Sequence, residues 1–279
     1  MQRFPGRSAF VDHFGSLGAG AVFAPFLADG LTPVAALLRL GPNPLGRFLL
    51  ESVEQGERLG RWSFVGAGAS ELVAFDGQYG LVFRAHPRDG VIYEADRWAS
   101  RDPLSELRER LRPWRVPTEV VKASLDGAPR AARELPPFFG GAVGFLGYDV
   151  VRTIERLGTV RPDPVGTWEA GYLLADTVVV FDHLRRMGYV VALARWDPVG
   201  GDPGAAYAEA SERVARVWER LHGPGGADGV WALSAAVEVP AAPVRDPGGA
   251  AVEDEAFEQA VRRARRYIEA GDIFQVVLS

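Results

Sequence analysis

The sequence predicts an α+β fold with a largely antiparallel β-sheet and packed helices. Strand and helix patterns do not alternate regularly, as they would in a parallel sheet, and short turns join at least two pairs of neighbouring strand patterns. Hydrophobic residues make up 47% of the 279 residues and charged residues 24%. This composition is sufficient for a buried core, and the length allows one large or two ordinary domains.

The first predicted helix covers 31–41. Thr32 is a suitable N-cap, Pro33 suits the first helical position, and Gly41 suits the end. The apolar stretch before it, 17–28, is expected to be an ordinary buried segment. Three stretches that follow are predicted as strand, strand and hairpin: 47–53, 61–66 and 71–85.

Helical spacing of apolar residues continues through the rest of the chain. It predicts helices over three further stretches: 102–114, 207–221 and 253–271. Strand patterns cover 138–151, two arms within 173–195, and the closing residues after Gly271. Two proline- and glycine-rich stretches, 115–137 and 222–250, are expected to be irregular or linking.

Composition excludes several classes of function. A net charge of −5 argues against nucleic acid as a partner, and the absence of cysteine excludes disulfides and thiolate chemistry. The apolar segment 17–28 is too short to span a membrane and contains Pro25, so no membrane association is expected. The glycine-rich stretch 140–147 lacks the Lys-Ser/Thr of a phosphate loop, and the four histidines show no metal-ligand spacing.

Two polar positions remain ambiguous on residue chemistry alone. In "LLES" (49–52), alternation places Glu51 and Ser52 on opposite faces, which is typical of an edge strand facing water. The alternative is a polar rim for a small zwitterion, which would need a bulge or only one true contact. Gln275 shares one face of the closing strand with Ile273 and Val277, so it points either to solvent or to a site wall.

Three stretches together, in this order, resemble anthranilate synthase component I, the large subunit of a chorismate-utilising enzyme. They are "LTPVAALLRL…FLLESVEQGERLGRWSFVG", "FFGGAVGFLGYDVVR" with "DTVVVFDHLRR", and "AGDIFQVVLS". The resemblance implies the N-terminal part of a two-layer fold. In that reading, 1–221 is the tryptophan-binding regulatory region, 222–252 is a linker or surface excursion, and 253–279 begins the chorismate-binding catalytic domain.

The resemblance implies a cytoplasmic enzyme of tryptophan biosynthesis. Its substrates would be chorismate and ammonia, the latter from a glutamine amidotransferase partner, and its products anthranilate and pyruvate. Tryptophan would inhibit it by feedback. Mg²⁺ is the implied cofactor, with ligands expected outside this chain. The chain is therefore expected to be an N-terminal fragment that is inactive alone.

The resemblance also carries roles onto particular residues. Ser52 is implied to bind tryptophan, with Glu51 beside it and Pro33 lining the pocket. Gln275 is implied to be catalytic. Related enzymes that add water have lysine at its position as a general base, whereas ammonia is already a nucleophile and needs only positioning. Gln275 therefore indicates amination.

Two alternatives remain open. Component I of aminodeoxychorismate synthase, an enzyme of folate biosynthesis, is also an aminating relative and stops before pyruvate is eliminated. The other alternative is a non-catalytic module that senses tryptophan or docks the amidotransferase.

Overall fold

The computed structural model describes residues 1–51, 60–86, 89–100, 102–128, 134–158, 166–223 and 254–278. The chain divides into two compact units, Met1–Ala232 and Leu233–Ser279, which are described separately below. All but the first two residues of the predicted linker 222–252 lie outside the described residues. Ser52 also lies outside them.

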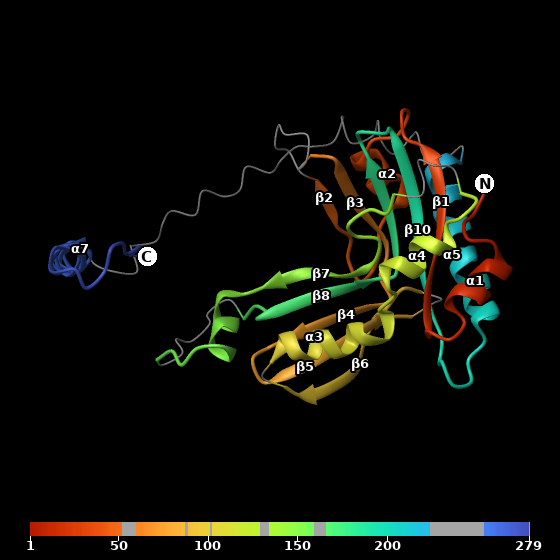
Figure 1. Cartoon of the computed structure of the whole chain (residues 1–279). Coiled ribbons are helices and arrows are strands. Elements are labelled where there is room, and N and C mark those ends of the chain that lie inside the picture. Colours follow the sequence, from red (N-terminus) through yellow and green to blue (C-terminus); the bar gives the residue numbers. More distant parts are fainter. Residues whose placement is uncertain are drawn as a thin grey trace. The chain divides into compact units, whose positions relative to one another are not determined.

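The first unit contains two five-stranded antiparallel sheets (Figure 1), which confirms the predicted fold class. In sheet A the strand order is β1 (Ala19–Leu27), β10 (Met187–Arg195), β9 (Thr177–Asp182), β3 (Trp62–Gly68) and β2 (Leu49–Glu51). In sheet B it is β6 (Ile92–Ala99), β5 (Tyr79–Ala85), β4 (Glu71–Phe75), β8 (Ala170–Ala175) and β7 (Gly141–Leu146).

Two chain segments run from one sheet into the other side by side. The first passes from β3 into β4, and the second passes from β8 into β9 through the single residue Asp176. The two segments pair in both sheets, with Trp62 opposite Asp182 in sheet A and Glu71 opposite Leu174 in sheet B. The amide of Leu193 in β10 donates to the carbonyl of Asp176 at 2.7 Å, which fixes the junction.

Helices α1 (Arg7–Phe14), α2 (Pro33–Leu40), α4 (Thr118–Ser124) and α5 (Pro203–His222) belong to the part of the unit around sheet A. Helix α5 packs on β10 and β1. Its N-cap Asp202 accepts from the Gly204 amide at 2.7 Å, and its buried stripe includes Ala210, Val214 and Leu221. Among the described residues, no helix combines the length and apolar character needed to cross a membrane.

Helix α3 (Pro103–Leu111) lies across sheet B in Figure 1 and continues into the 3₁₀ turn η1 (Arg112–Trp114). Asp102 caps α3 by accepting from the amides of Leu104 and Ser105. Leu107 and Leu111 pack against the smaller core of sheet B. A second 3₁₀ turn, η3 (Tyr148–Thr153), follows β7, so the strand predicted over 138–151 is shorter than expected.

The first strand predicted within 173–195 is in fact two strands, β8 in sheet B and β9 in sheet A, which separate at Asp176. Four further elements were not predicted from the sequence: α1, β1, β6 and α4. Helix α4 lies within the proline-rich stretch 115–137, and most residues of β6 are exposed, without the apolar alternation that marks a half-buried strand.

In the second unit the described residues contain α7 (Asp254–Ala270), close to the predicted helix. Gly271 ends it as expected, with a φ of 79° and an amide that donates to Ile268. The strand predicted after Gly271 is wrong, because 273–278 forms no regular strand. A strand is stable only when paired, and the described part of this unit offers no second strand.

Candidate functional site

A cavity of about 200 Å³ lies beside the end of β9 and the start of α2. Thr32 accepts a hydrogen bond from the Ala35 amide at 3.1 Å, so Pro33 is held at the first helical position, where a missing amide costs nothing. The nine residues that line the cavity are Ala28, Asp29, Leu31, Thr32, Pro33, Phe181, Asp182, His183 and Arg186. Pro33, which is buried, therefore lies in a cavity wall.

Glu51 lies on the same face of sheet A as Phe181 in the cavity wall. It is the last residue of β2 and is directly opposite Ser63, which is directly opposite Phe181. Directly opposite residues share a face, and strands are about 4.8 Å apart, so Glu51 and Phe181 are about 10 Å apart along the sheet. The Ser63 hydroxyl lies 2.7 Å from Nε2 of His183, another wall residue.

The row through Phe181 continues across sheet A. Gly188 of β10 is opposite Phe181 and also opposite Phe26 of β1. A Cβ on Gly188 would overlap the Phe26 ring, so this position needs glycine for the ring to lie across it. Phe26 packs edge-on against Phe181 with ring centroids 5.9 Å apart. The wall of the cavity is therefore supported from behind by aromatic packing.

Of the other predicted site residues, Glu51 is in the first unit, Gln275 is in the second unit, and Ser52 is outside the described residues. Glu51 is exposed on the edge strand β2, as the simpler sequence interpretation expected, and it does not line the cavity. Gln275 is exposed in the second unit, in the irregular segment after α7. Their roles, and that of Ser52, stay predictions.

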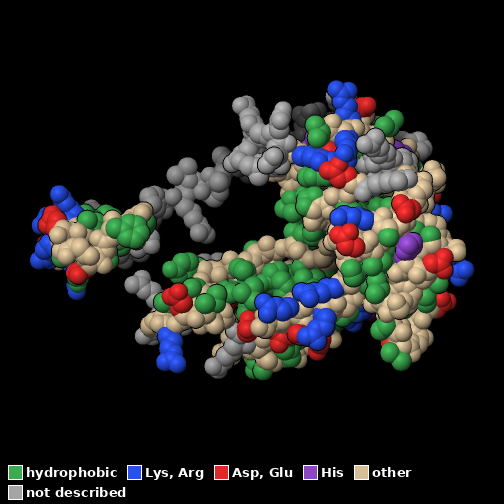
Figure 2. Space-filling view, in the orientation of Figure 1, with side chains coloured by type: hydrophobic (Ala, Val, Ile, Leu, Met, Phe, Trp, Pro, Cys, Tyr) green, Lys and Arg blue, Asp and Glu red, His purple; other side chains and the backbone are tan. Residues whose placement is uncertain are grey.

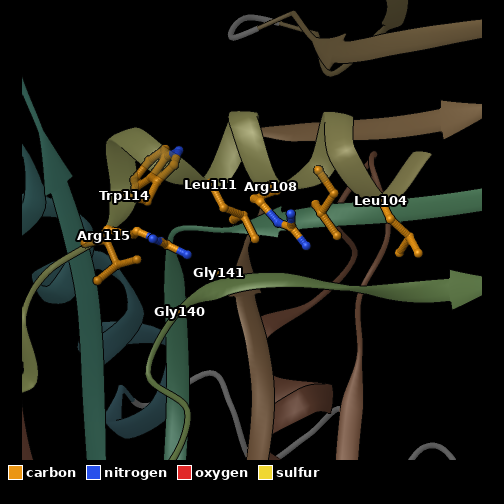
Figure 3. A pocket seen from close by; sticks show the side chains of 9 residues that line it. Leu104, Arg108, Leu111, Trp114, Arg115, Gly140 and Gly141 are labelled. Atoms are coloured by element: carbon orange, nitrogen blue, oxygen red, sulfur yellow. The ribbon is translucent and has the colours of Figure 1, made fainter. Parts of the chain in front are cut away.

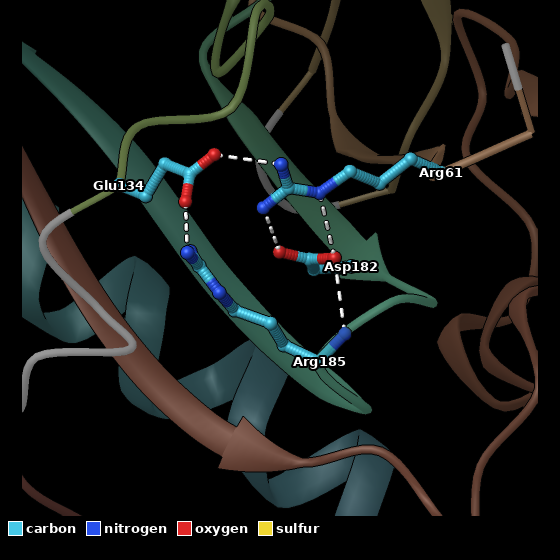
Figure 4. Close-up of polar contacts among 4 residues, drawn as sticks. All are labelled: Arg61, Glu134, Asp182 and Arg185. Carbon is cyan, nitrogen blue, oxygen red and sulfur yellow. Dashed lines mark hydrogen bonds and ion pairs between the residues drawn. The ribbon is translucent and has the colours of Figure 1, made fainter. Parts of the chain in front are cut away.

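A cluster of four charged residues adjoins the cavity (Figure 4). Asp182, with no exposed surface, accepts from Nε and Nη2 of Arg61 at 3.0 and 2.6 Å. The third guanidinium nitrogen of Arg61, Nη1, donates to the Glu134 carboxylate at 2.6 Å. Arg185 forms an ion pair with the same carboxylate. The backbone amide of Arg185 donates to Asp182 at 3.3 Å. The cluster thus ties β3, β9, the turn after β9 and the segment at 134 together.

These contacts fix the charges of the cluster. The hydrogen bond to Asp182, followed by that to Glu134, raises the pKa of Arg61 well above its usual value. The hydrogen bond from Arg61 lowers the pKa of Glu134. Burial, followed by the charge of Asp182, raises the pKa of Tyr189 to about 12. Both shifts favour the charged forms of Arg61 and Glu134, so this ion pair is kept at neutral pH beside the turn that bounds the cavity.

The cavity offers both signs of charge beside an apolar wall. Asp29 and Arg186 lie 3.9 Å apart, and both side chains are largely exposed. Arg186 has a φ of 55°, the left-handed conformation, in the turn between β9 and β10. A carboxylate and a guanidinium next to the Phe181 ring match the ammonium, carboxylate and apolar body of an amino acid.

Sequence reasoning missed the charged cluster. The sequence did contain one signal: Asp182 is a single acid at the end of the apolar strand "TVVVFD". If this carboxylate is buried, it needs a charged partner, because an unpaired buried charge is costly. Its partner, Arg61, is 121 residues away in the sequence. No local pattern identifies a partner at that separation.

Comparison with known proteins places the chain in a family. The sequence profile of the chorismate binding enzymes matches residues 61–279. Anthranilate synthase component 1 of Thermus thermophilus is 39% identical over 260 residues, covering 91% of this chain and 45% of that protein. The Pseudomonas aeruginosa protein of the same name is 35% identical over 257 residues, covering 91% and 46%.

The chain spans about half the length of the curated relatives it matches. Among solved structures, anthranilate synthase component I of Streptococcus pneumoniae aligns with 88% of this chain and 45% of its own, at 21% identity and a TM-score of 0.44. Because the family profile covers most of the sequence, the chain belongs to the chorismate-binding enzyme family.

Proposed function

We propose that this chain belongs to the large subunit of an anthranilate synthase, a lyase of tryptophan biosynthesis. The observation that carries the proposal is the match, over about nine-tenths of the chain, to several proteins named anthranilate synthase component 1 at 30–39% identity. These names favour anthranilate over the aminodeoxychorismate alternative. Because the chain spans about half of those relatives, the activity is proposed for the protein that the whole gene encodes.

The proposed reaction joins chorismate and ammonia. Ammonia forms a bond to C2 of chorismate, the C4 hydroxyl leaves as water, and elimination of the enolpyruvyl group gives pyruvate and anthranilate. Ammonia needs no strong base, so the neutral amide of Gln275 would position the nucleophile rather than activate it. The partner that supplies ammonia from glutamine is an amidotransferase subunit, and the protein acts in the cytoplasm.

Mg²⁺ is proposed for the same protein, where it would neutralise a carboxylate of chorismate. The described residues include no group of three or more histidine or acidic side chains that could hold a metal ion. The described residues therefore do not fit such a site.

Tryptophan is the proposed inhibitor, and the cavity at Pro33 is its proposed site. The apolar wall, the two charges at its mouth and the position of Glu51 on the same face of sheet A support this. At about 200 Å³, the cavity is smaller than the ~300–1,000 Å³ typical of ligand pockets. Ser52 would complete the polar rim.

The reaction is tested on the protein expressed from the complete gene, with chorismate, ammonium and Mg²⁺. Anthranilate is measured by fluorescence and pyruvate by a coupled dehydrogenase. Equal amounts of both are expected. An amino product without pyruvate would replace this proposal with the aminodeoxychorismate enzyme, and no amino product would refute both.

The inhibitor site is tested separately. In the same assay, Glu51→Gln is expected to raise the half-inhibitory tryptophan concentration about tenfold, the effect of losing one charged hydrogen bond. Glu109→Gln is the control, since Glu109 is an exposed acid paired with Arg112 on α3. Equal inhibition of the wild type and the Glu51 variant would exclude Glu51 from the site.

A further inference from the structure

A second and larger cavity, of about 400 Å³, lies between α3 and sheet strands β7 and β10 (Figure 3). It lies in the first unit and shares no lining residue with the cavity at Pro33. Its volume is within the ~300–1,000 Å³ typical of small-molecule sites. Nothing in the proposed reaction uses it.

The walls of this cavity are apolar. Leu104, Leu107 and Leu111 of α3 recur at helical spacing, so they line one side, and Trp114 of η1 continues that side. Leu193 of β10, which is 4% exposed, lies on the other side. The surface is suited to a flat or branched hydrocarbon body.

Glycine backbone forms the floor. Gly140 has a φ of 145°, and a Cβ added there would lie 2.5 Å from Cδ1 of Leu193. Gly141, with a φ of 137°, follows it at the start of β7. The chain therefore approaches Leu193 closely at this point without a side chain, which leaves the space under α3 open.

The rim is cationic. In Figure 3 the guanidinium groups of Arg108 and Arg115 both point into the space between α3 and β7. Neither arginine forms an ion pair with any residue that the structure describes. Arg195 does not line the cavity, but its guanidinium carbon lies 5.3 Å from the centre of the Trp114 ring in the cavity wall. Figure 2 shows basic side chains over α3 beside a band of hydrophobic surface along β7 and β8.

Among the described residues, the neighbouring arginines form ion pairs, unlike Arg108 and Arg115. On the same segment, Arg110 lies 3.9 Å from carboxylates of both Glu71 and Asp96, and Arg112 pairs with Glu109. No acid lines the cavity. Asp176, which lines the adjoining small void, already accepts a hydrogen bond from the Thr177 hydroxyl at 2.9 Å.

We propose that this cavity binds a small apolar monocarboxylate, with its carboxylate on Arg108 and Arg115 and its body against the leucines and Trp114. Guanidinium groups bind carboxylates through charge-assisted hydrogen bonds, often two at once. Charge complementarity thus selects the anion, and the apolar walls select the body. The proposal does not depend on the proposed function.

The test uses 2-naphthoate as the probe and the purified chain of 279 residues, by isothermal titration calorimetry. A dissociation constant of about 1 mM or lower is expected from the size of the probe. Arg108→Gln and Arg115→Gln should each weaken binding about tenfold. Neutral 2-naphthamide should bind at least tenfold more weakly than the acid.

Arg112→Gln is the matched control, because Arg112 is an exposed arginine of η1 that is paired elsewhere and does not line the cavity. It should bind 2-naphthoate as the wild type does. Circular dichroism of every variant checks that the fold is kept. The proposal is overturned by the absence of binding at 5 mM probe (roughly five times the expected constant), by equal affinity for the amide, or by wild-type affinity in both rim variants.

Discussion

Replacing Arg61 with methionine tests whether the charged cluster holds sheet A together. Methionine keeps much of the apolar stem but removes both hydrogen bonds to Asp182, which has no exposed surface. Removing one partner of a buried pair typically costs about 3–5 kcal/mol, because the other charge is left without compensation. The Arg61 side chain is 17% exposed and the Arg185 amide still donates to Asp182, so we expect about 3 kcal/mol.

This loss is a large share of a total stability of about 5–15 kcal/mol. For a unit of 232 residues it corresponds to a fall in Tm of about 6–12 °C. Urea unfolding followed by tryptophan fluorescence measures the change in free energy, and agreement with circular dichroism checks that the transition is two-state.

The double variant Arg61→Met, Asp182→Asn supplies the internal comparison. It removes both charges, so it should lose less than the sum of the two single variants, with a coupling of about 1–3 kcal/mol. A loss below about 1 kcal/mol for Arg61→Met, or additive single effects, would refute the assignment of a buried, mutually dependent pair.

Three further predictions follow from the same part of the molecule. The lowered pKa of Glu134 means that its ion pairs stabilise the fold above about pH 4.5 and stop doing so as the pH falls through the folded-state pKa. Glu134→Gln should therefore cost about 0.2–1 kcal/mol at pH 7 and nothing at pH 2 in urea unfolding, and an equal cost at both values would contradict the linkage. Gly188→Ala should cost about 1–3 kcal/mol, since a Cβ would overlap the ring of Phe26, whereas Gly30→Ala has open space and should cost less than 1 kcal/mol; thermal unfolding compares them. The pKa of Tyr189, raised to about 12, favours the folded state below about pH 10 and ceases to do so as the pH rises to about 12, so Tyr189→Phe should lose less stability across that range than the wild type in alkaline urea titrations.

Elements with caps and strong periodicity were predictable from local sequence. Thr32 and Pro33 mark the start of α2, and Gly271 marks the end of α7. Among the missed elements, α4 is short and most of β6 is exposed, whereas β1 is a nine-residue strand that is largely buried and contains a proline. The strand predicted after Gly271 failed for the opposite reason, because a strong strand pattern forms no strand without a partner.

The candidate site was predictable only in part. Pro33 carries a helix-start signal, and its place in a cavity wall depends on Phe181, which is nearly 150 residues away. The pairing of Asp182 with Arg61 depends on strand register, which the sequence does not reveal without knowing which strands are neighbours. Long-range pairing decided the geometry in both cases.

The two chain segments that run through both sheets have a consequence for how the protein folds. They pair residues 95 to 120 positions apart, from Phe75 with Ala170 to Trp62 with Asp182. Both sheets therefore depend on the same event, in which the β3–β4 segment pairs with the β8–β9 segment. The loop-closure entropy of bringing these two segments together is lost only once, and this one loss allows strand pairing in both sheets. We therefore expect the sheets to form slowly and in a single cooperative step, so that neither sheet serves as a stable folding intermediate for the other.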